Sequence, residues 1–197
     1  MNIDITSISF RLSIGLTIFL ILGVRDYLKN REDPKRAKEY LFIAGCSIAS
    51  IVYAIIHDCI TFSISPEYFA IAKDLGEDVK LFPDVVLLAT KASYWVGIIV
   101  GLVLVVANNP FKNYKQLTYT ELAKQIPLPL MAALIFGFLA YFIPDLTEPV
   151  FSKGGEEILK DPENFERVAF IHWGTYIGGL LGLVVAALKV LRKRIHY

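Results

Sequence analysis

The sequence has only two cysteines in 197 residues and lacks the short motifs of the common catalytic sites. Cys46 and Cys59 lie in one apolar segment, about 20 Å apart along a helix that rises 1.5 Å per residue. They cannot bridge to each other, so a disulfide framework is excluded. The HExxH, GxSxG and CxxC patterns and the phosphate-binding loop are also absent, which excludes the standard hydrolase, dithiol and nucleotide sites.

An excess of charge of one sign is lacking as well. The chain has 20 basic and 19 acidic residues and no arginine-rich tract or zinc-finger spacing. This balance gives no case for nucleic-acid binding, so we expect no nucleic-acid partner. Alternation with a period of two, which is typical of barrel strands, is also absent. Apolar residues are plentiful instead: they make up 55% of the chain and are concentrated in blocks, as in membrane proteins.

Five apolar blocks are each close to the ~20 residues that a helix needs to cross a membrane. They are Ile5–Leu28, Tyr40–Ile64, Val85–Val106, Ile126–Ile143 and Val168–Leu188. Backbone groups in lipid must be paired within their own segment, which favours helices. We therefore predict an all-α, polytopic transmembrane helix bundle of about five spans, which forms one membrane domain over residues 1–197.

Charges in the connecting segments predict the orientation. Lys29–Glu39, Asn108–Gln125 and the C-terminal tail are rich in lysine and arginine, whereas Ser63–Asp84 and Asp145–Arg167 are acidic. Basic segments preferentially face the cytoplasm, and here they alternate with acidic ones in register with five crossings. We predict an outside N-terminus and a cytoplasmic C-terminus in a bacterial cytoplasmic (inner) membrane.

Two proline signals mark the starts of helices in the acidic segments. Ser65-Pro66-Glu67 combines an N-cap residue, a proline at the first helical position and an acid in the first turn. It predicts a short surface helix over about Pro66–Asp74, with Tyr68 and Phe69 on its membrane face. Asp161-Pro162-Glu163 repeats the signal, so the fifth helix should extend over about residues 162–192 and rise above the lipid.

Small residues recur at every fourth position in the third and fifth blocks. The glycines of these rows are Gly97, Gly101, Gly174, Gly178 and Gly182. In lipid such rows let helix backbones approach closely. They predict either packing of the third and fifth spans within the chain or an interface between subunits.

The second block carries a polar stripe on one helix face. Its members are Cys46, Ser50, Tyr53, His57 and Thr61, with Asp58 about 100° round the helix. In the predicted topology His57 and Asp58 lie within about two turns of the outer end. His172 in the fifth block lies at a similar depth, with Tyr176 one turn below it.

Three further residues fall at the same level. Lys91 lies about two turns into the third block, and Glu67 and Tyr68 lie just above, in the acidic segment. Ionisable residues at membrane depth are rare and usually functional. We predict one polar site with metal ligands and surrounding polar groups. The ligands are His57, His172, Glu67 and Asp58, and the surrounding groups are Thr61, Tyr68, Lys91 and Tyr176.

Ordinary structural roles remain open for each residue. Asp58 and Lys91 would form a buried ion pair, Glu67 would stabilise a helix N-terminus, and each histidine would be a satisfied interfacial side chain. If the site is functional, three chemistries fit it: a zinc or non-haem iron site, a relay of protons or an anion site, and a pair of haem ligands. Haem fits least, because Asp58 and Lys91 would have no purpose beside it.

The residues from Tyr53 to Thr61, followed by Glu67-Tyr68-Phe69, resemble a pattern in a family of small bacterial multi-pass membrane proteins that has no assigned activity. The resemblance continues at Trp95-Val96-Gly97, Pro127–Tyr141, His172 and Tyr176, and covers about Ile48–Lys193. The span Ile5–Leu28 is an addition to the family pattern. The resemblance implies the membrane class and the site residues His57, Asp58, Thr61, Glu67, Tyr68 and His172, but no reaction.

The function that follows is an integral membrane protein of unknown activity with a polar, metal-binding site near its outer face. The alternative is a non-enzymatic subunit or scaffold of a larger membrane assembly, which the glycine rows and the missing catalytic motifs favour. The sequence does not decide whether the protein is an enzyme. The lipid bilayer is one partner, and a homo-oligomer or other membrane proteins are further candidates. Transport is weakly supported, because no inverted repeat and no paired broken spans are visible.

Overall fold

The computed structural model describes residues 8–109, 114–144 and 159–195, and the regular elements of this part of the chain are all helices. They are α1 (Ile8–Lys29), α2 (Lys35–Ile64), α3 (Pro66–Ile71), the one-turn π-helix η1 (Leu81–Val85), α4 (Val86–Ala107), α5 (Tyr119–Ala123), α6 (Pro127–Ala140) and α7 (Pro162–Ile195). The predicted all-α class is therefore confirmed.

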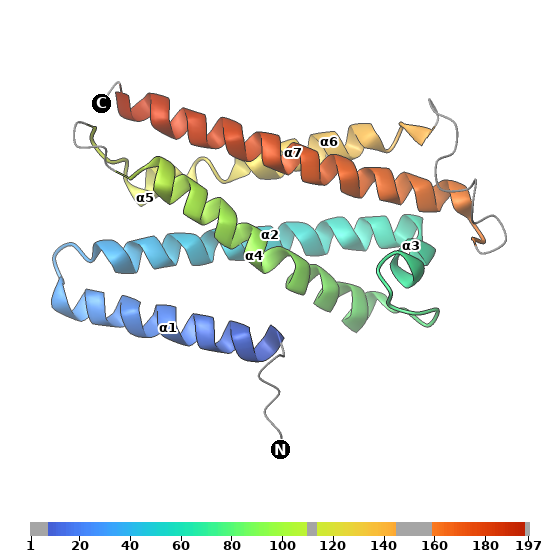
Figure 1. Ribbon diagram of the computed structural model, residues 1–197, viewed down its shortest axis with the longest axis horizontal. Coiled ribbons are helices and arrows are strands. Elements are labelled where there is room, and N and C mark those ends of the chain that lie inside the picture. The colour runs from blue at the N-terminus through green and yellow to red at the C-terminus, as the bar shows by residue number, and fades with distance from the viewer. Residues whose placement is uncertain (1–7, 110–113, 145–158, 196–197) are drawn as a thin grey trace, which may run out of the picture.

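Four helical segments within the described residues are long and apolar enough to cross a membrane. They are Lys35–Ile64, Leu81–Ala107, Tyr119–Ala140 and Pro162–Arg194. The predicted first span, Ile5–Leu28, corresponds to α1, which runs beside α2, and its first three residues lie outside the described part (Figure 1). The helices form the predicted membrane bundle, and a count of about five spans is consistent with it.

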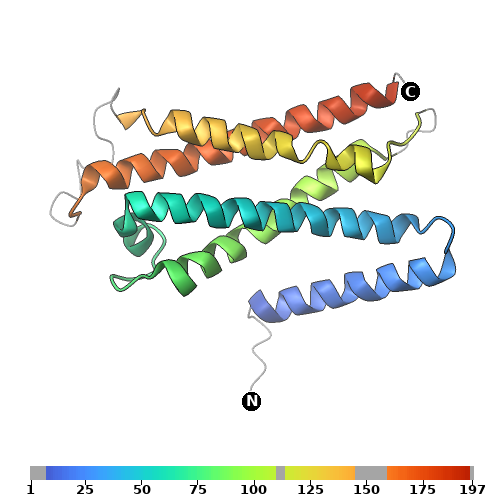
Figure 2. The ribbon, with the colours of Figure 1, turned by 180° about the vertical axis from the view of Figure 1, so that it is seen from behind.

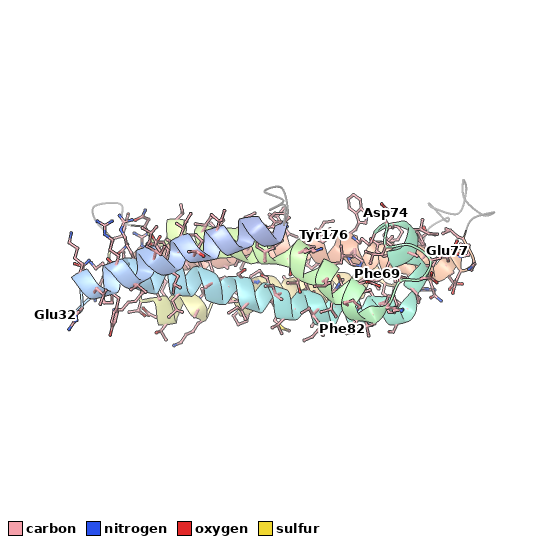
Figure 3. The ribbon with its side chains drawn as sticks, turned by 90° about the horizontal axis from the view of Figure 1, so that it is seen from below. Glu32, Phe69, Asp74, Glu77, Phe82 and Tyr176 are labelled. Atoms are coloured by element: carbon pink, nitrogen blue, oxygen red, sulfur yellow. The ribbon has the colours of Figure 1, made fainter. Side chains whose placement is uncertain are left out.

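The connecting segments gather at two ends of the bundle according to their charge. The α1–α2 connection, α5 and the end of α7 lie at one end, and α3 and the start of α7 lie at the other (Figures 1 and 2). Figure 3 shows Glu32 at the first end and Phe69 and Glu77 at the second. We call them the basic end and the acidic end. The described parts of the basic and of the acidic segments thus lie at opposite ends, which agrees with the predicted alternation.

The glycine row of α4 packs against α2. A Cβ added to Gly97 would collide with the backbone of Ser47, and one added to Gly101 would lie 3.0 Å from the Cα of Ile43. The two backbones can approach this closely only because both positions lack a side chain.

The glycine row of α7 packs against α6 in the same way. A Cβ on Gly174 would lie 2.5 Å from the carbonyl oxygen of Phe136, and one on Gly182 would lie 2.6 Å from the Cα of Pro129. Gly178, between them, faces the backbone of Ala132. Both predicted glycine rows therefore pack within the chain, the third span against the second and the fifth against the fourth.

Two apolar clusters join these helix pairs. The cluster near the basic end includes Cys46, Leu104 and Leu122, and it brings in Ala186 and Val190 from α7. The cluster near the acidic end contains Tyr68, Phe69, Val85, Phe165, Val168 and Ala169. The surface helix is shorter than predicted, and its aromatic residues do not face the membrane. Phe69 is fully buried because α3 folds inward over the start of α7.

Candidate functional site

The imidazoles of α2 and α7 meet between the two apolar clusters. The ring centroids of His57 and His172 lie 4.8 Å apart, and the ring planes are nearly perpendicular at 81°. Tyr53, one turn along α2, stacks on His57 with centroids 5.8 Å apart. The spacing of the sequence placed both histidines at one depth, and the structure brings them into contact.

Asp58 holds the imidazole next to it. Its Oδ1 lies 2.9 Å from Nδ1 of His57, and the side chains of both residues are 11% exposed. An ionised carboxylate only accepts hydrogen bonds, so in the neutral imidazole of His57 the proton is on Nδ1 and Nε2 is left as an acceptor. The hydroxyl of Thr175 on α7 lies 3.1 Å from this Nε2 and donates to it. Asp58 therefore fixes both the orientation and the tautomer of His57.

Thr61 supports the site through the backbone of α2. Its hydroxyl donates to the carbonyl oxygen of His57 at 3.0 Å and lies 3.3 Å from that of Asp58. Such bonds back to the preceding turn locally shape a helix. Thr61 is almost fully buried, and its hydroxyl bonds to these carbonyl groups rather than to the imidazoles.

His172 has a polar atom whose partner is missing. The residue is 3% exposed, and its Nε2 is buried with no hydrogen-bond partner in the described structure. The ring of Tyr68 stacks on it with centroids 5.0 Å apart and an angle of 18°. Leaving a buried polar atom unpaired costs about 1–3 kcal/mol, and such an atom commonly marks a bound water or ion.

His57, Asp58 and His172 form a group that could hold a metal ion. Each offers one ligand atom, and these atoms all lie within 4.8 Å of one another. Two ligands that share a tetrahedral zinc ion at 2.0–2.1 Å are roughly 3.3 Å apart. Since no two of these atoms are more than 4.8 Å apart, the two imidazoles would need to approach by at most about 1.5 Å to close on one ion.

Lys91 does not belong to this group, contrary to the prediction. It is exposed on α4, whose buried face is set by Ala89 and Ser93. Lys91 lies two residues from each of them, which is about 200° round the helix. The prediction for Lys91 used its depth in the membrane alone, and its side chain points away from the other helices of the bundle.

Glu67 is also used elsewhere than predicted. Its carboxylate accepts the backbone N–H groups of Lys160 at 2.7 Å and Asp161 at 3.0 Å. A carboxylate suits this position, because it satisfies amide donors at the start of α7 and complements the positive end of the helix dipole. Glu67 thus ties α3 to α7 and is not among the three grouped ligands.

Lys73 is a neighbour of the site that the sequence did not single out. Its ammonium lies 5.3 Å from the ring centroid of Tyr68 and interacts with the hydroxyls of Tyr68 and Tyr176. Burial lowers the pKa of Lys73, but these interactions outweigh burial and raise it above the ordinary value. Burial also raises the pKa of Tyr68, and Lys73 opposes that shift.

Tyr176 lies at the lipid-facing edge of the group. It is 60% exposed, and its ring centroid is 6.1 Å from that of His172. The predicted polar residues therefore divide into a buried centre and an exposed rim, and Tyr176 belongs to the rim.

No family model, curated protein or solved structure matches the chain. We therefore infer function from the geometry of the group, and the resemblance drawn from the sequence stays a prediction.

Proposed function

We propose that the protein binds one divalent transition-metal ion between α2 and α7, in the outer half of a bacterial cytoplasmic membrane. The observation that carries the proposal is the grouping of His57, Asp58 and His172, combined with the unpartnered Nε2 of His172. Imidazole is a ligand suited to zinc and to non-haem iron, the two metals that the sequence favours.

The hydrogen bonds favour different roles for the three residues in this proposal. Nε2 of His57 and Nε2 of His172 are the direct ligands. The metal ion then replaces the hydroxyl of Thr175 as the partner of Nε2 of His57. Asp58 stays on Nδ1 of His57, 2.9 Å away, as the carboxylate that orients a metal-bound histidine. Two protein ligands are one fewer than catalytic zinc sites usually have, so positions stay open for water or a small ligand.

The measurement that tests this proposal is the metal content of the full chain, purified in detergent with a tag that contains no histidine. After exposure to Zn²⁺ or Fe²⁺ and desalting, we expect about one ion per chain. His57→Ala and His172→Ala should each lose it. Lys91→Gln is the matched control, because Lys91 lies at the same predicted level but outside the group. Absence of stoichiometric metal, or its retention in both histidine variants, would contradict the proposal.

The alternative function, a non-enzymatic subunit or scaffold, loses one of its two arguments. The glycine rows that favoured an interface are used inside the chain, where α4 packs on α2 and α7 packs on α6. Gentle extraction followed by mass measurement remains the direct test of a larger assembly.

A further inference from the structure

A pocket of about 460 Å³ opens at the basic end, where α5 ends and α6 begins. Three lysines line it: Lys124 follows α5, while Lys189 and Lys193 come from α7. Leu128 and Met131 of α6 form an apolar part of the wall. The pocket lies at the opposite end of α7 from His172, so it is independent of the proposed metal site.

The lysines leave positive charge without a partner. Lys193 lies 3.0 Å from the carboxylate of Glu121. For Lys124 and Lys189, no ion pair is found among residues 8–109, 114–144 and 159–195. Lys189 and Lys193 also lie one turn apart on the same face of α7, where like charges repel. A concave site with about two uncompensated positive charges attracts an anion.

The apolar side of the pocket continues towards the middle of the membrane. Met131, Ile135 and Phe138 lie on one face of α6, at steps of four and three, and all are exposed. Val185 of α7, one turn from Lys189, is exposed as well. The site therefore offers ammonium groups at the level of the headgroups and a hydrocarbon surface directly beneath them.

We infer that this pocket binds an anionic phospholipid of the cytoplasmic leaflet. Its phosphates lie on Lys124, Lys189 and Lys193, and its acyl chains lie along Met131 and the α6 face beyond it. Basic pockets between transmembrane helices on the cytoplasmic side are suited to such headgroups. A lipid with two phosphodiester charges, such as a diphosphatidylglycerol, matches the two uncompensated charges better than one with a single charge.

Native mass spectrometry of the full chain tests the assignment by counting bound lipids. The protein is titrated in non-ionic detergent with phosphatidylcholine, phosphatidylglycerol or diphosphatidylglycerol, and inorganic phosphate forms a separate arm. We expect one tightly bound diphosphatidylglycerol, weaker phosphatidylglycerol binding and no retained phosphatidylcholine. Inorganic phosphate at 10 mM, roughly the upper range of a weak anion site, should not displace the lipid.

The variant Lys124→Gln/Lys189→Gln/Lys193→Gln should lose affinity for diphosphatidylglycerol. A lysine near an anionic headgroup contributes about fivefold, so three contribute on the order of a hundredfold. The matched control, Arg31→Gln/Lys35→Gln/Arg36→Gln, removes the same charge from the α1–α2 connection and the first turn of α2, at the same end, and should bind as the unchanged protein does. Circular dichroism confirms that both variants are folded.

Three outcomes would overturn the inference. One is equal loss of affinity in both triple variants, which would mean that only net charge matters. Another is displacement of the lipid by inorganic phosphate, which would make the pocket a site for the free anion. The third is an unchanged affinity in the pocket variant, which would place the lipid elsewhere. The metal content at His57 and His172 is measured separately and is not affected by any of these results.

Discussion

Replacing Asp58 by asparagine tests the role of the carboxylate beside His57. Asparagine has nearly the same shape, and its carbonyl oxygen can still accept from Nδ1–H, which lies 2.9 Å from Oδ1. The change therefore removes the negative charge but keeps the hydrogen bond. Partners of metal-bound histidines typically contribute 10–100-fold to metal affinity, or about 1.4–2.7 kcal/mol. We expect Asp58→Asn to lower the metal affinity about tenfold. Asp58→Ala also loses the hydrogen bond and should lower the affinity about a hundredfold.

The assay is a competition titration with a fluorescent zinc chelator, with the protein held in lipid nanodiscs. Asp84→Asn is a matched control, because the carboxylate of Asp84 also accepts one N–H, the backbone N–H of Lys80 at 3.0 Å, but lies outside the group. Loss of binding as complete as in His57→Ala would make Asp58 a direct ligand. A metal affinity within twofold of that of the unchanged protein would mean that Asp58 does not contribute to metal binding. Either result refutes the orienting role.

Three further predictions concern the scaffold. Gly178→Ala should lower the thermal unfolding temperature in detergent, because the added Cβ overlaps a carbonyl of α6 and such overpacking costs about 1–3 kcal/mol. Gly179→Ala is the control and should leave that temperature unchanged, because its Cβ would meet only one methyl group, at 3.7 Å. Glu67→Gln should speed amide hydrogen exchange at the start of α7, since a neutral amide is the weaker acceptor for two N–H groups. Asn108→Ala should destabilise the fold by about 1–3 kcal/mol in the same melting assay, because it leaves both backbone groups of Leu117 unpaired.

The sequence was sufficient to predict the helical membrane bundle and the meeting of the two imidazoles. The length of an apolar block matches the thickness of the membrane, and residues four positions apart lie on one helix face. Depth in the membrane then follows from counting residues from a helix end. His57 and His172 could therefore be placed at one level, and the measured centroid distance of 4.8 Å agrees with that expectation.

Depth alone could not predict the direction of a side chain. Lys91 has the right level but the wrong face, because the buried face of α4 is decided by packing against α2. Thr175 was missed because a threonine in an apolar block carries no distinctive signal, although it lies three residues from His172. Lys73 was missed because it reaches the site only after α3 folds inward, which the sequence around Tyr68 did not indicate.

The position of the site follows from which helices the glycines join. The backbones come into close contact where α4 meets α2 and where α7 meets α6. Lipid is as apolar as the side chains of these helices, so van der Waals packing holds the pairs together. The seam between the pairs has no glycine row, so α2 and α7 stay far enough apart for whole side chains to lie between them. Apolar clusters fill the seam near both ends, and His57, Asp58, Thr175 and His172 fill it between those clusters. Polar groups there are satisfied by one another, by an ordered water or by a bound ligand, and the unpaired Nε2 of His172 shows that they do not fully satisfy one another. An apolar side chain in place of His172 would join the helices without the cost of an unpaired buried nitrogen, so packing alone does not explain this histidine.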